Sequence, residues 1–444
     1  MDLTAHHMRE LAGYSGRALR FLEEAKAGIG DVLQVETSWG PVSGTLVPRY
    51  SYGDDEHIVL KLKTGYNVGL AVGKLVSASV KARGEKPAFN VPQRPKKKPG
   101  LPRVLILGTG GTIASRVDYR TGAVRPAISA GELHSLIPEL SAVADVETEI
   151  MFNVLSENIA PSHWSKLAVR VGRAVKQGFD GIVIMHGTDT MGYTAAALSF
   201  ALVRVPCPVV LVGAQRSSDR PSSDAVFNLI GSVSFAAESP YSGVYVGMHL
   251  DESDERVALH RGTRVRKNHT SRRDAFVSVG VPIAAVWGPS GLEDADPGLP
   301  PRGKGPFKPR SKFDGRVALL KFYPSMPGRM IRAVKLLGAK ALVLEGTGLG
   351  HVSSEDTAAV KEFVRKGGLA FITSQCIEGR VDLNVYDTGR DLLKAGVVPL
   401  EDMLSETALA KAMWALGNSA TAKEAKEIMV EDLAGEMTSR RFPG

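Results

Sequence analysis

The chain has 444 residues, a hydrophobic fraction of 43%, a formal net charge of +8 and an isoelectric point near 9.3. At roughly 100–200 residues per domain, this is the composition of a globular protein with two to four domains. It contains no run of about 18 apolar residues, which excludes a membrane-spanning helix. The positive charge is compatible with RNA contact but does not require it.

Residues 1–83 are expected to form a helix and a small β-barrel domain. Leu11, Leu19 and Leu22 share one face of a helix among charged residues. Short β-rich runs follow, separated by glycine and aspartate clusters: Val32–Thr37, Val42–Val47, His57–Leu62 and Leu75–Val80. Short strands at close spacing favour a barrel.

Residues 84–101 are predicted to form a linker, because prolines and glycines break regular structure there and Lys96–Lys98 keeps the segment solvated. From residue 102 apolar strands alternate with helices. Continuous apolar runs at 103–107, 181–185 and 208–212 indicate parallel strands that are buried on both faces. Residues 102–290 are therefore expected to form an α/β lobe.

Residues 291–315 are predicted to be a second linker that carries a cluster of basic side chains, and residues 316–444 a second α/β lobe. Its apolar strands are expected at 317–321, 341–345 and 369–373, and its last part, about 400–436, as helix. The predicted fold class is thus α/β, with two Rossmann-like lobes on parallel sheets behind a small N-terminal β-barrel domain.

The chain contains two cysteines, Cys207 and Cys376, and its cysteine content indicates the cellular compartment. Cys207 begins an apolar stretch and is interpreted as a buried core residue rather than a metal ligand or half of a disulfide. Residues 1–7 lack the basic region and apolar run of a secretory signal. We therefore expect a reducing, cytoplasmic location.

The first motif that could carry chemistry is Gly108–Ser115, directly after a strand. Ile113 stands where a dinucleotide fingerprint needs glycine, and no Gly-Lys-Ser/Thr follows, so neither a dinucleotide nor a phosphate loop is predicted. The motif instead presents the Thr112 hydroxyl at the carboxyl end of a strand, where open α/β sheets bind ligands. A plain tight turn is the alternative interpretation.

Two further motifs carry a hydroxyl, a carboxylate and an amine. In His186–Met191, Thr188 and Asp189 open a helix, and taken alone they could be only a helix cap. His186 is interpreted as structural. Lys267 lies among arginines, which usually means a solvated basic face, but neighbouring positive charges also favour a deprotonated amine that can act as a base.

Together these three motifs resemble the bacterial-type L-asparaginase family over roughly residues 100–425, and Glu345–His351 resembles it as well. The resemblance implies two α/β lobes joined by a linker, hydrolysis of a side-chain carboxamide without a metal or cofactor, and sites completed at a dimer interface. It implies Thr112 as the nucleophile, with Thr188, Asp189 and Lys267 as a hydrogen-bonded relay; which threonine attacks first stays open. Further residues match a substrate-clamping loop and a lid: Ser156, Glu157 and, in the lid, Tyr119.

Residues 1–100 are not explained by asparaginases. This front part and the stretch Ser115–Val124 resemble the D-subunit family of archaeal glutamyl-tRNA(Gln) amidotransferases. That resemblance implies a glutaminase that releases ammonia from glutamine or asparagine. A partner E subunit would use ATP and Mg²⁺ to convert Glu-tRNA(Gln) to Gln-tRNA(Gln), with this chain as a homodimer within a heterotetramer. No motif of this chain resembles an ATP site.

Two other hypotheses remain open at this stage. One is a free-standing asparaginase or glutaminase with an accessory domain. The other is a non-enzymatic RNA-binding scaffold that uses residues 1–100, Lys96–Lys98 and the basic cluster at 302–312, against which the complete set of site residues speaks.

Overall fold

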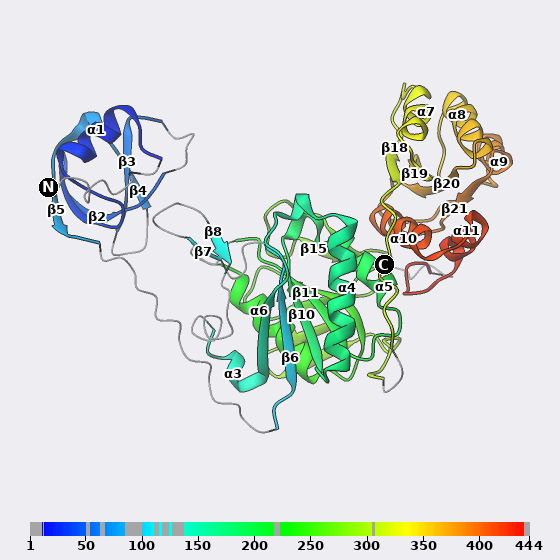
Figure 1. Cartoon of the computed structure of the whole chain (residues 1–444), viewed down its shortest axis with the longest axis horizontal. Coiled ribbons are helices and arrows are strands. Elements are labelled where there is room, and N and C mark those ends of the chain that lie inside the picture. Colours follow the sequence, from blue (N-terminus) through cyan, green and yellow to red (C-terminus); the bar gives the residue numbers. More distant parts are fainter. Residues whose placement is uncertain are drawn as a thin grey trace, which may run out of the picture. The chain divides into compact units, whose positions relative to one another are not determined.

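The computed structural model (Figure 1) describes residues 11, 13–49, 54–62, 67–84, 100–110, 115–117, 124–126, 137–216, 223–303 and 307–438. These residues fall into two compact units. The first comprises Met1–Pro92 with Ser115–Ala127, and the second comprises Gln93–Ala114 with Ile128–Gly444. Each unit is described by itself.

The first unit holds an antiparallel sheet of five strands in the order β4-β3-β2-β1-β5. Its elements are α1 (Gly16–Glu24), β1 (Val32–Thr37), β2 (Gly40–Leu46), β3 (His57–Lys61), β4 (Asn67–Ala71), η1 (Val72–Lys74) and β5 (Leu75–Ala82). Alternate residues of β1 are buried, so Leu33 and Val35 join Leu22 of α1 in one core. The four strands expected from the sequence are present. β4 is an additional strand, whose pattern is weakened by Asn67 and Gly69.

A separate two-stranded antiparallel sheet is formed by β7 (Ser115–Val117) and β8 (Val124–Pro126). Strand β7 and the first residue of β8 lie in the stretch Ser115–Val124 that resembles the D-subunit family.

The first lobe of the second unit contains a sheet of eight strands in the order β17-β16-β13-β12-β11-β10-β6-β9. The strands are β6 (Arg103–Gly108), β9 (Asp145–Ile150), β10 (Gly181–Met185), β11 (Pro208–Val212), β12 (Gly243–His249), β13 (Val257–Arg261), β16 (Ala285–Gly288) and β17 (Gly291–Ala295). Pairing is parallel from β9 to β12 and antiparallel from β12 to β17. The sheet is therefore mixed, whereas the sequence indicated only its parallel half.

Helices cover both faces of the parallel half, which is why its central strands β10 and β11 are apolar and fully buried, whereas the edge strand β9 is mostly polar. The helical segments are α3 (Leu140–Val143), η2 (Ser156–Asn158), α4 (Pro161–Lys176), η3 (Thr188–Thr190), α5 (Met191–Ala201) and α6 (Ala225–Glu238). Figure 1 shows α6 on one side of β6, β10 and β11, with α4 on the other. A short hairpin, β14 (Val265–Lys267) with β15 (Phe276–Ser278), completes the lobe.

The second lobe has a parallel sheet in the order β18-β19-β20-β21. Its elements are β18 (Val317–Lys321), α7 (Arg329–Leu336), β19 (Ala341–Gly346), α8 (Ser354–Arg365), β20 (Leu369–Ser374), α9 (Asp387–Lys394), β21 (Val397–Pro399), α10 (Ser405–Asn418) and α11 (Ala422–Val430). Alternate residues of β19 enter two different cores. Val343 packs in a core with Trp414 of α10, and Leu344 packs in a core with Phe363 of α8.

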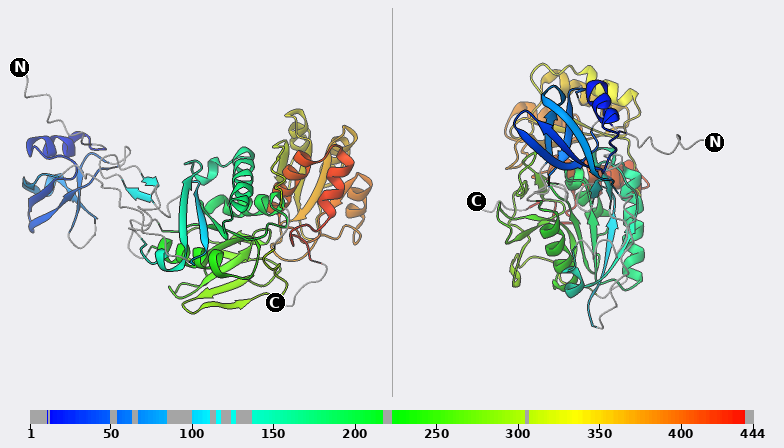
Figure 2. Two further views of the ribbon diagram at one scale, coloured as in Figure 1. Left: turned by 60° about the horizontal axis from the view of Figure 1, so that its bottom comes forward. Right: turned by 90° about the vertical axis from the view of Figure 1, so that its left-hand side faces the viewer.

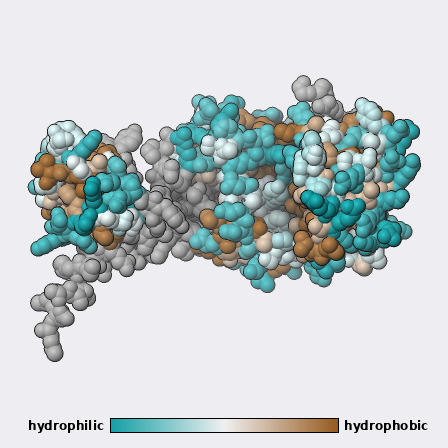
Figure 3. Space-filling model, turned by 90° about the horizontal axis from the view of Figure 1, so that it is seen from above, coloured by the Kyte–Doolittle hydropathy of each residue, from teal (hydrophilic) through white to brown (hydrophobic). Residues whose placement is uncertain are grey.

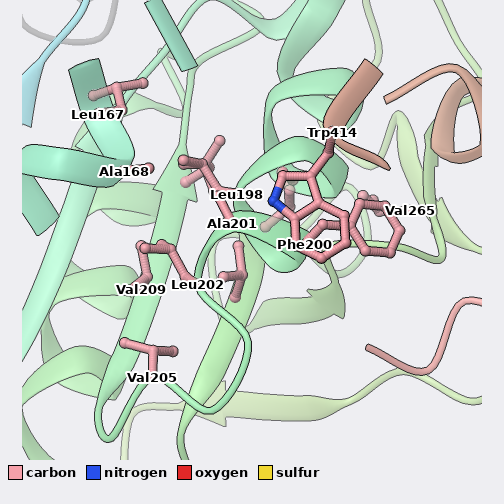
Figure 4. Packing of buried hydrophobic residues seen from close by; sticks show 14 of the residues in the cluster. Leu167, Ala168, Leu198, Phe200, Ala201, Leu202, Val205, Val209, Val265 and Trp414 are labelled. Atoms are coloured by element: carbon pink, nitrogen blue, oxygen red, sulfur yellow. The ribbon is translucent and has the colours of Figure 1, made fainter. Parts of the chain in front are cut away.

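The two lobes share one hydrophobic core. Phe200 of α5, Val265 of β14 and Trp414 of α10 lie together in it (Figure 4), and the Trp414 indole donates a hydrogen bond of 2.7 Å to the Arg310 carbonyl. The left view of Figure 2 shows the lobes side by side, the first in green and the second in yellow to red. Because α5 is buried against α10, the lobes form one body.

The segment 291–315, expected to be a linker, begins with strand β17, which pairs with β16 through a tight turn. The pairing escaped the sequence analysis because β17 lies at the sheet edge and is only partly buried, so it carries no apolar alternation. On the face drawn in Figure 3, hydrophilic side chains cover most of the described surface of the second unit. Among the described helices, none has the length and apolar character needed to cross a bilayer.

Candidate active site

The candidate site begins where β10 ends. All five residues of β10 are buried, and the chain leaves the sheet through His186 and Gly187 into η3 and α5. Thr188 and Asp189 therefore stand at the carboxyl end of a central parallel strand, the edge at which open α/β sheets bind ligands. Thr188 is half-buried and Asp189 is exposed.

Lys267 reaches this edge from β14, far along the chain. Its Nζ donates hydrogen bonds of 2.9 Å to Thr188 Oγ1 and 2.8 Å to Asp189 Oδ1. The Lys267 side chain is 14% exposed, so its ammonium group is largely shielded, whereas the Asp189 side chain is 70% exposed and open to a ligand. The structure thus brings together three of the residues that the sequence analysis assigned to a relay.

Ser156 joins the same group from η2. Its hydroxyl is 3.5 Å from Asp189 Oδ2, and its carbonyl accepts a hydrogen bond of 2.7 Å from Thr190 Oγ1. Ser156 is only 6% exposed. Thr190, which the sequence analysis did not single out, therefore holds the Ser156 backbone, and the second hydroxyl in the Thr-Asp-Thr motif is the signal that could have identified it. The neighbouring Glu157 is exposed.

The described start of the glycine-rich loop is tied to this edge. Thr109 donates from its backbone N–H (3.1 Å) and its hydroxyl (2.8 Å) to the Met185 carbonyl at the end of β10. Gly110 adopts φ = +117°, and a Cβ on it would lie 2.2 Å from the Val154 carbonyl, so only glycine fits. Two of the predicted site residues, Thr112 and Tyr119, lie outside the described residues.

His186 has the structural role expected of it. It is fully buried, and burial lowers its pKa to about 4, so the ring is neutral near pH 7. Its Nε2 lies 2.9 Å from the Thr194 hydroxyl, which also accepts a hydrogen bond of 3.0 Å from the Trp164 indole. These contacts fix the turn that presents Thr188.

The arrangement contains a hydroxyl, an amine and a carboxylate in hydrogen-bond contact. A threonine hydroxyl is a weak nucleophile until a neighbouring base accepts its proton, and this set provides one candidate base, Lys267. Within the described parts of the chain, no group of three or more His, Cys, Asp or Glu side chains is placed to hold a metal ion. The geometry suits amide hydrolysis by a side-chain nucleophile.

Comparison with known families divides the chain in the same places. Residues 103–292 match the family "Asparaginase, N-terminal", residues 316–429 match the "Glutaminase/Asparaginase C-terminal domain", and residues 27–80 match the "GatD N-terminal domain". Both lobes of the second unit, including the one that carries the site, are thus asparaginase-like, and the small sheet domain matches a different family.

Known proteins are similar to the chain over nearly its whole length. The chain is 48% identical to the D subunit of the glutamyl-tRNA(Gln) amidotransferase of Metallosphaera sedula, over 97% of each chain, and 47% identical to that of Pyrococcus abyssi, over 95% of this chain and 98% of the relative. Among solved structures, the thermostable L-asparaginase from Thermococcus kodakarensis superposes with a TM-score of 0.68 and 34% identity, over 76% of this chain and 100% of the asparaginase. With 28% identity, L-asparaginase I from Vibrio cholerae superposes with a TM-score of 0.66 over 76% of this chain. The chain therefore belongs to the D-subunit family of glutamyl-tRNA(Gln) amidotransferases, which carries an asparaginase-like hydrolase fold.

Proposed function

We propose that this chain is the glutaminase subunit of a tRNA-dependent amidotransferase, releasing ammonia from glutamine, or from asparagine in its place, for the conversion of Glu-tRNA(Gln) to Gln-tRNA(Gln). The observation that supports amide hydrolysis is the contact of Lys267 Nζ with both Thr188 Oγ1 (2.9 Å) and Asp189 Oδ1 (2.8 Å). An amine held between a hydroxyl and a carboxylate is an arrangement that can move a proton to and from an attacking oxygen.

The proposed reaction has two halves. A threonine oxygen, from Thr112 or Thr188, bonds to the carboxamide carbon, and its proton passes into the relay that contains Lys267. The carbon–nitrogen bond then breaks, the leaving nitrogen takes up the proton, and ammonia departs. Water attacks the resulting ester, which releases glutamate and restores the threonine hydroxyl.

Asp189 has a second task in this proposal. Its carboxylate is 70% exposed beside the buried Ser156, so it can bind the α-ammonium group of an amino-acid substrate while it holds Lys267. Ser156 and Glu157 would bind the α-carboxylate and α-ammonium end, and Tyr119 would lie in a lid that closes over the substrate.

The small front domain distinguishes this proposal from a free-standing asparaginase. The superposition on the asparaginase from Thermococcus kodakarensis includes 100% of the asparaginase but only 76% of this chain. Residues 27–80 match the GatD N-terminal domain. We assign to the partner E subunit the ATP- and Mg²⁺-dependent activation of Glu-tRNA(Gln), and to this chain a homodimer within a heterotetramer in the cytoplasm, with no cofactor of its own.

A free-standing asparaginase or glutaminase is the second candidate function, favoured by the superposition on L-asparaginases. The two functions differ in their dependence on a partner. Fast hydrolysis of asparagine by the chain alone, unchanged by the E subunit and Glu-tRNA(Gln), would support this second function. Ammonia release that rises when the E subunit and Glu-tRNA(Gln) are added would support the first.

The site itself is tested with Lys267→Met in the complex with the E subunit. We expect ammonia release from glutamine to fall by at least about 10²-fold, since a general base contributes roughly 10²–10⁴-fold. Added ammonium chloride should restore Gln-tRNA(Gln) formation, because only the ammonia source is lost. Lys394→Met, which removes a lysine paired with Asp391 on the exposed surface of α9, is the matched control and should behave as the parent. Full ammonia release by Lys267→Met would refute the proposal.

A further inference from the structure

Strand β14 connects the candidate site with the second lobe. Successive side chains of a strand point to opposite faces. Lys267 contacts Thr188, and Val265 is buried in the shared core. Arg264, directly before the strand, and Arg266 point the other way and form ion pairs with carboxylates of the second lobe.

The Arg264 pair is the more buried of these two. Arg264 is 1% exposed, and its two terminal nitrogens donate to the Asp402 carbonyl (2.8 Å) and to Asp402 Oδ2 (2.7 Å). Two hydrogen bonds from one planar guanidinium, to the backbone and to the side chain of the same residue, fix orientation as well as distance. Arg266 adds a looser contact of 3.3 Å to Glu406.

Asp402 is held in turn by the C-terminal segment, residues 431–438. Thr438 donates its backbone N–H to Asp402 Oδ1 (2.9 Å) and its hydroxyl to Oδ2 (2.5 Å). Burial opposes ionisation of Asp402, but the hydrogen bonds from Thr438 and Arg264 outweigh it and lower the pKa of this carboxyl. Asp402 is therefore a charged acceptor with both oxygens occupied.

The C-terminal segment is itself anchored at two points. Glu436, 0% exposed, pairs over 2.5 Å with the equally buried Lys411 of α10 and accepts hydrogen bonds from the backbone of Leu433 and Ala434. The Ala434 carbonyl accepts a hydrogen bond of 3.0 Å from Thr263, the residue before Arg264. The segment thus reaches both lobes at the point where the chain enters β14.

From this connected set we infer that Asp402, held by Thr438 of the C-terminal segment, is a positioning residue that acts through Arg264 to place Lys267 against Thr188 and Asp189. The inference rests on the proposed function of Lys267. The relay requires hydrogen-bond distances near 2.9 Å, and a displacement of about 1 Å at a reacting group can lower a rate by roughly 10²-fold. Lys267 lies only three positions after Arg264, and β14 connects them, so a shift of the guanidinium is transmitted to the amine.

The inference is tested on the full chain in complex with the E subunit, with kcat, KM and the pH dependence of kcat measured for ammonia release from glutamine. We expect Asp402→Asn to lower kcat by about tenfold or more, to leave KM within about twofold, and to displace the pH profile, since the surroundings of the Lys267 amine change. Thr438→Val is the milder variant, because it removes one hydrogen bond and no charge; we expect a severalfold loss of kcat. Thr438→Ser restores the hydroxyl and should restore the parent kcat and pH profile.

The matched control is the Arg261–Asp296 ion pair, which joins β13 to the loop after β17 over 2.6 Å with both side chains 20% exposed. Asp296→Asn should leave kcat and its pH profile unchanged in the folded protein. The positioning inference is overturned if folded Asp402→Asn and Thr438→Val keep the parent kcat and pH profile, or if Asp296→Asn alters them equally. If Lys267→Met retains full activity, the proposed function fails first, so the two failures are distinguishable.

Discussion

Gly187 lies so close to Ser156 that a Cβ on Gly187 would stand 2.7 Å from the Ser156 Cβ and 3.1 Å from its Oγ. This contact lets the loop of η2 approach the turn after β10, and it places the Ser156 hydroxyl beside Asp189. The absence of a side chain at position 187 therefore shapes the proposed substrate end of the site.

Gly187→Ala should push Ser156 away from Asp189. We expect KM for glutamine to rise by about tenfold and the free energy of unfolding to fall by about 1–3 kcal/mol, the usual consequence of overpacking. Steady-state kinetics with glutamine and a urea titration measure both effects. Gly73→Ala, where nothing lies within 4 Å of the added Cβ, is the control and should change neither. An unchanged KM in Gly187→Ala would contradict a role for Ser156 in binding.

Gly110→Ala should abolish ammonia release. Position 110 has φ = +117°, and the new Cβ would lie 2.2 Å from the Val154 carbonyl oxygen. Because this oxygen belongs to the backbone, a change of side-chain rotamer cannot relieve the clash, and the backbone has to move. Because Thr112 follows two residues later, we expect this movement to displace one of the two proposed nucleophiles. The prediction is checked by measuring kcat alongside the circular dichroism spectrum, and it is contradicted by a folded variant with the parent kcat.

Asp189→Asn should impair substrate binding and proton transfer with little effect on the free energy of unfolding. Asp189 is 70% exposed, so loss of its ion pair with Lys267 should change the free energy of unfolding by no more than about 1 kcal/mol. We expect kcat/KM for glutamine to fall by at least about 10²-fold, since a charged partner of the substrate and of Lys267 is lost. Asp391→Asn, at the exposed pair with Lys394, provides a control with parent activity. Parent-like kcat/KM in Asp189→Asn would remove this residue from the site.

His260 should make stability depend on pH. It is fully buried, and burial lowers its pKa from 6.5 to about 4. Between these values the unfolded chain binds a proton that the folded chain does not, so stability is complete above about pH 6.5 and falls as the pH drops toward 4, by up to about 3 kcal/mol. Denaturant titrations across this window measure the effect. His260→Leu should reduce the dependence of the free energy of unfolding on pH, and the contribution of His186, whose pKa is also about 4, should remain. An unaltered pH dependence in His260→Leu would contradict the lowered pKa of His260.

Trp414→Ala should weaken the packing between the two lobes. Trp414 is 1% exposed and packs against Phe200 with ring centroids 5.9 Å apart (Figure 4). Its indole donates a hydrogen bond to the Arg310 carbonyl. Removal of a buried aromatic side chain costs about 3–5 kcal/mol, so we expect a large decrease in the denaturant midpoint. Val430→Ala, at a site 51% exposed, should have little effect. A Trp414→Ala midpoint equal to the parent value would contradict the shared core.

The α/β fold class and the family follow from the sequence and are confirmed, because they depend on local patterns. Continuous apolar runs such as Ile182–Met185, alternating with helical stretches, are typical of buried parallel strands, and the residues after them are then placed at one edge of the sheet. The motif around Thr188 and Asp189 could therefore be assigned to the ligand-binding edge without coordinates. Its catalytic role stays a prediction.

The family resemblance implied that Lys267 meets Thr188 and Asp189, but the local sequence pattern could not show it, and the contact itself comes from the tertiary structure. Lys267 lies 79 positions from Thr188, and no local pattern shows that β14 turns its amine toward η3, since that direction is set by packing of Val265 in the core. Strand β17, with little apolar alternation, was likewise identifiable only from its pairing. The contacts of Arg264 with Asp402 and of Asp402 with Thr438 depend on how the two lobes pack, because hydrogen bonds between buried charged groups form only where the whole fold excludes water and aligns the partners.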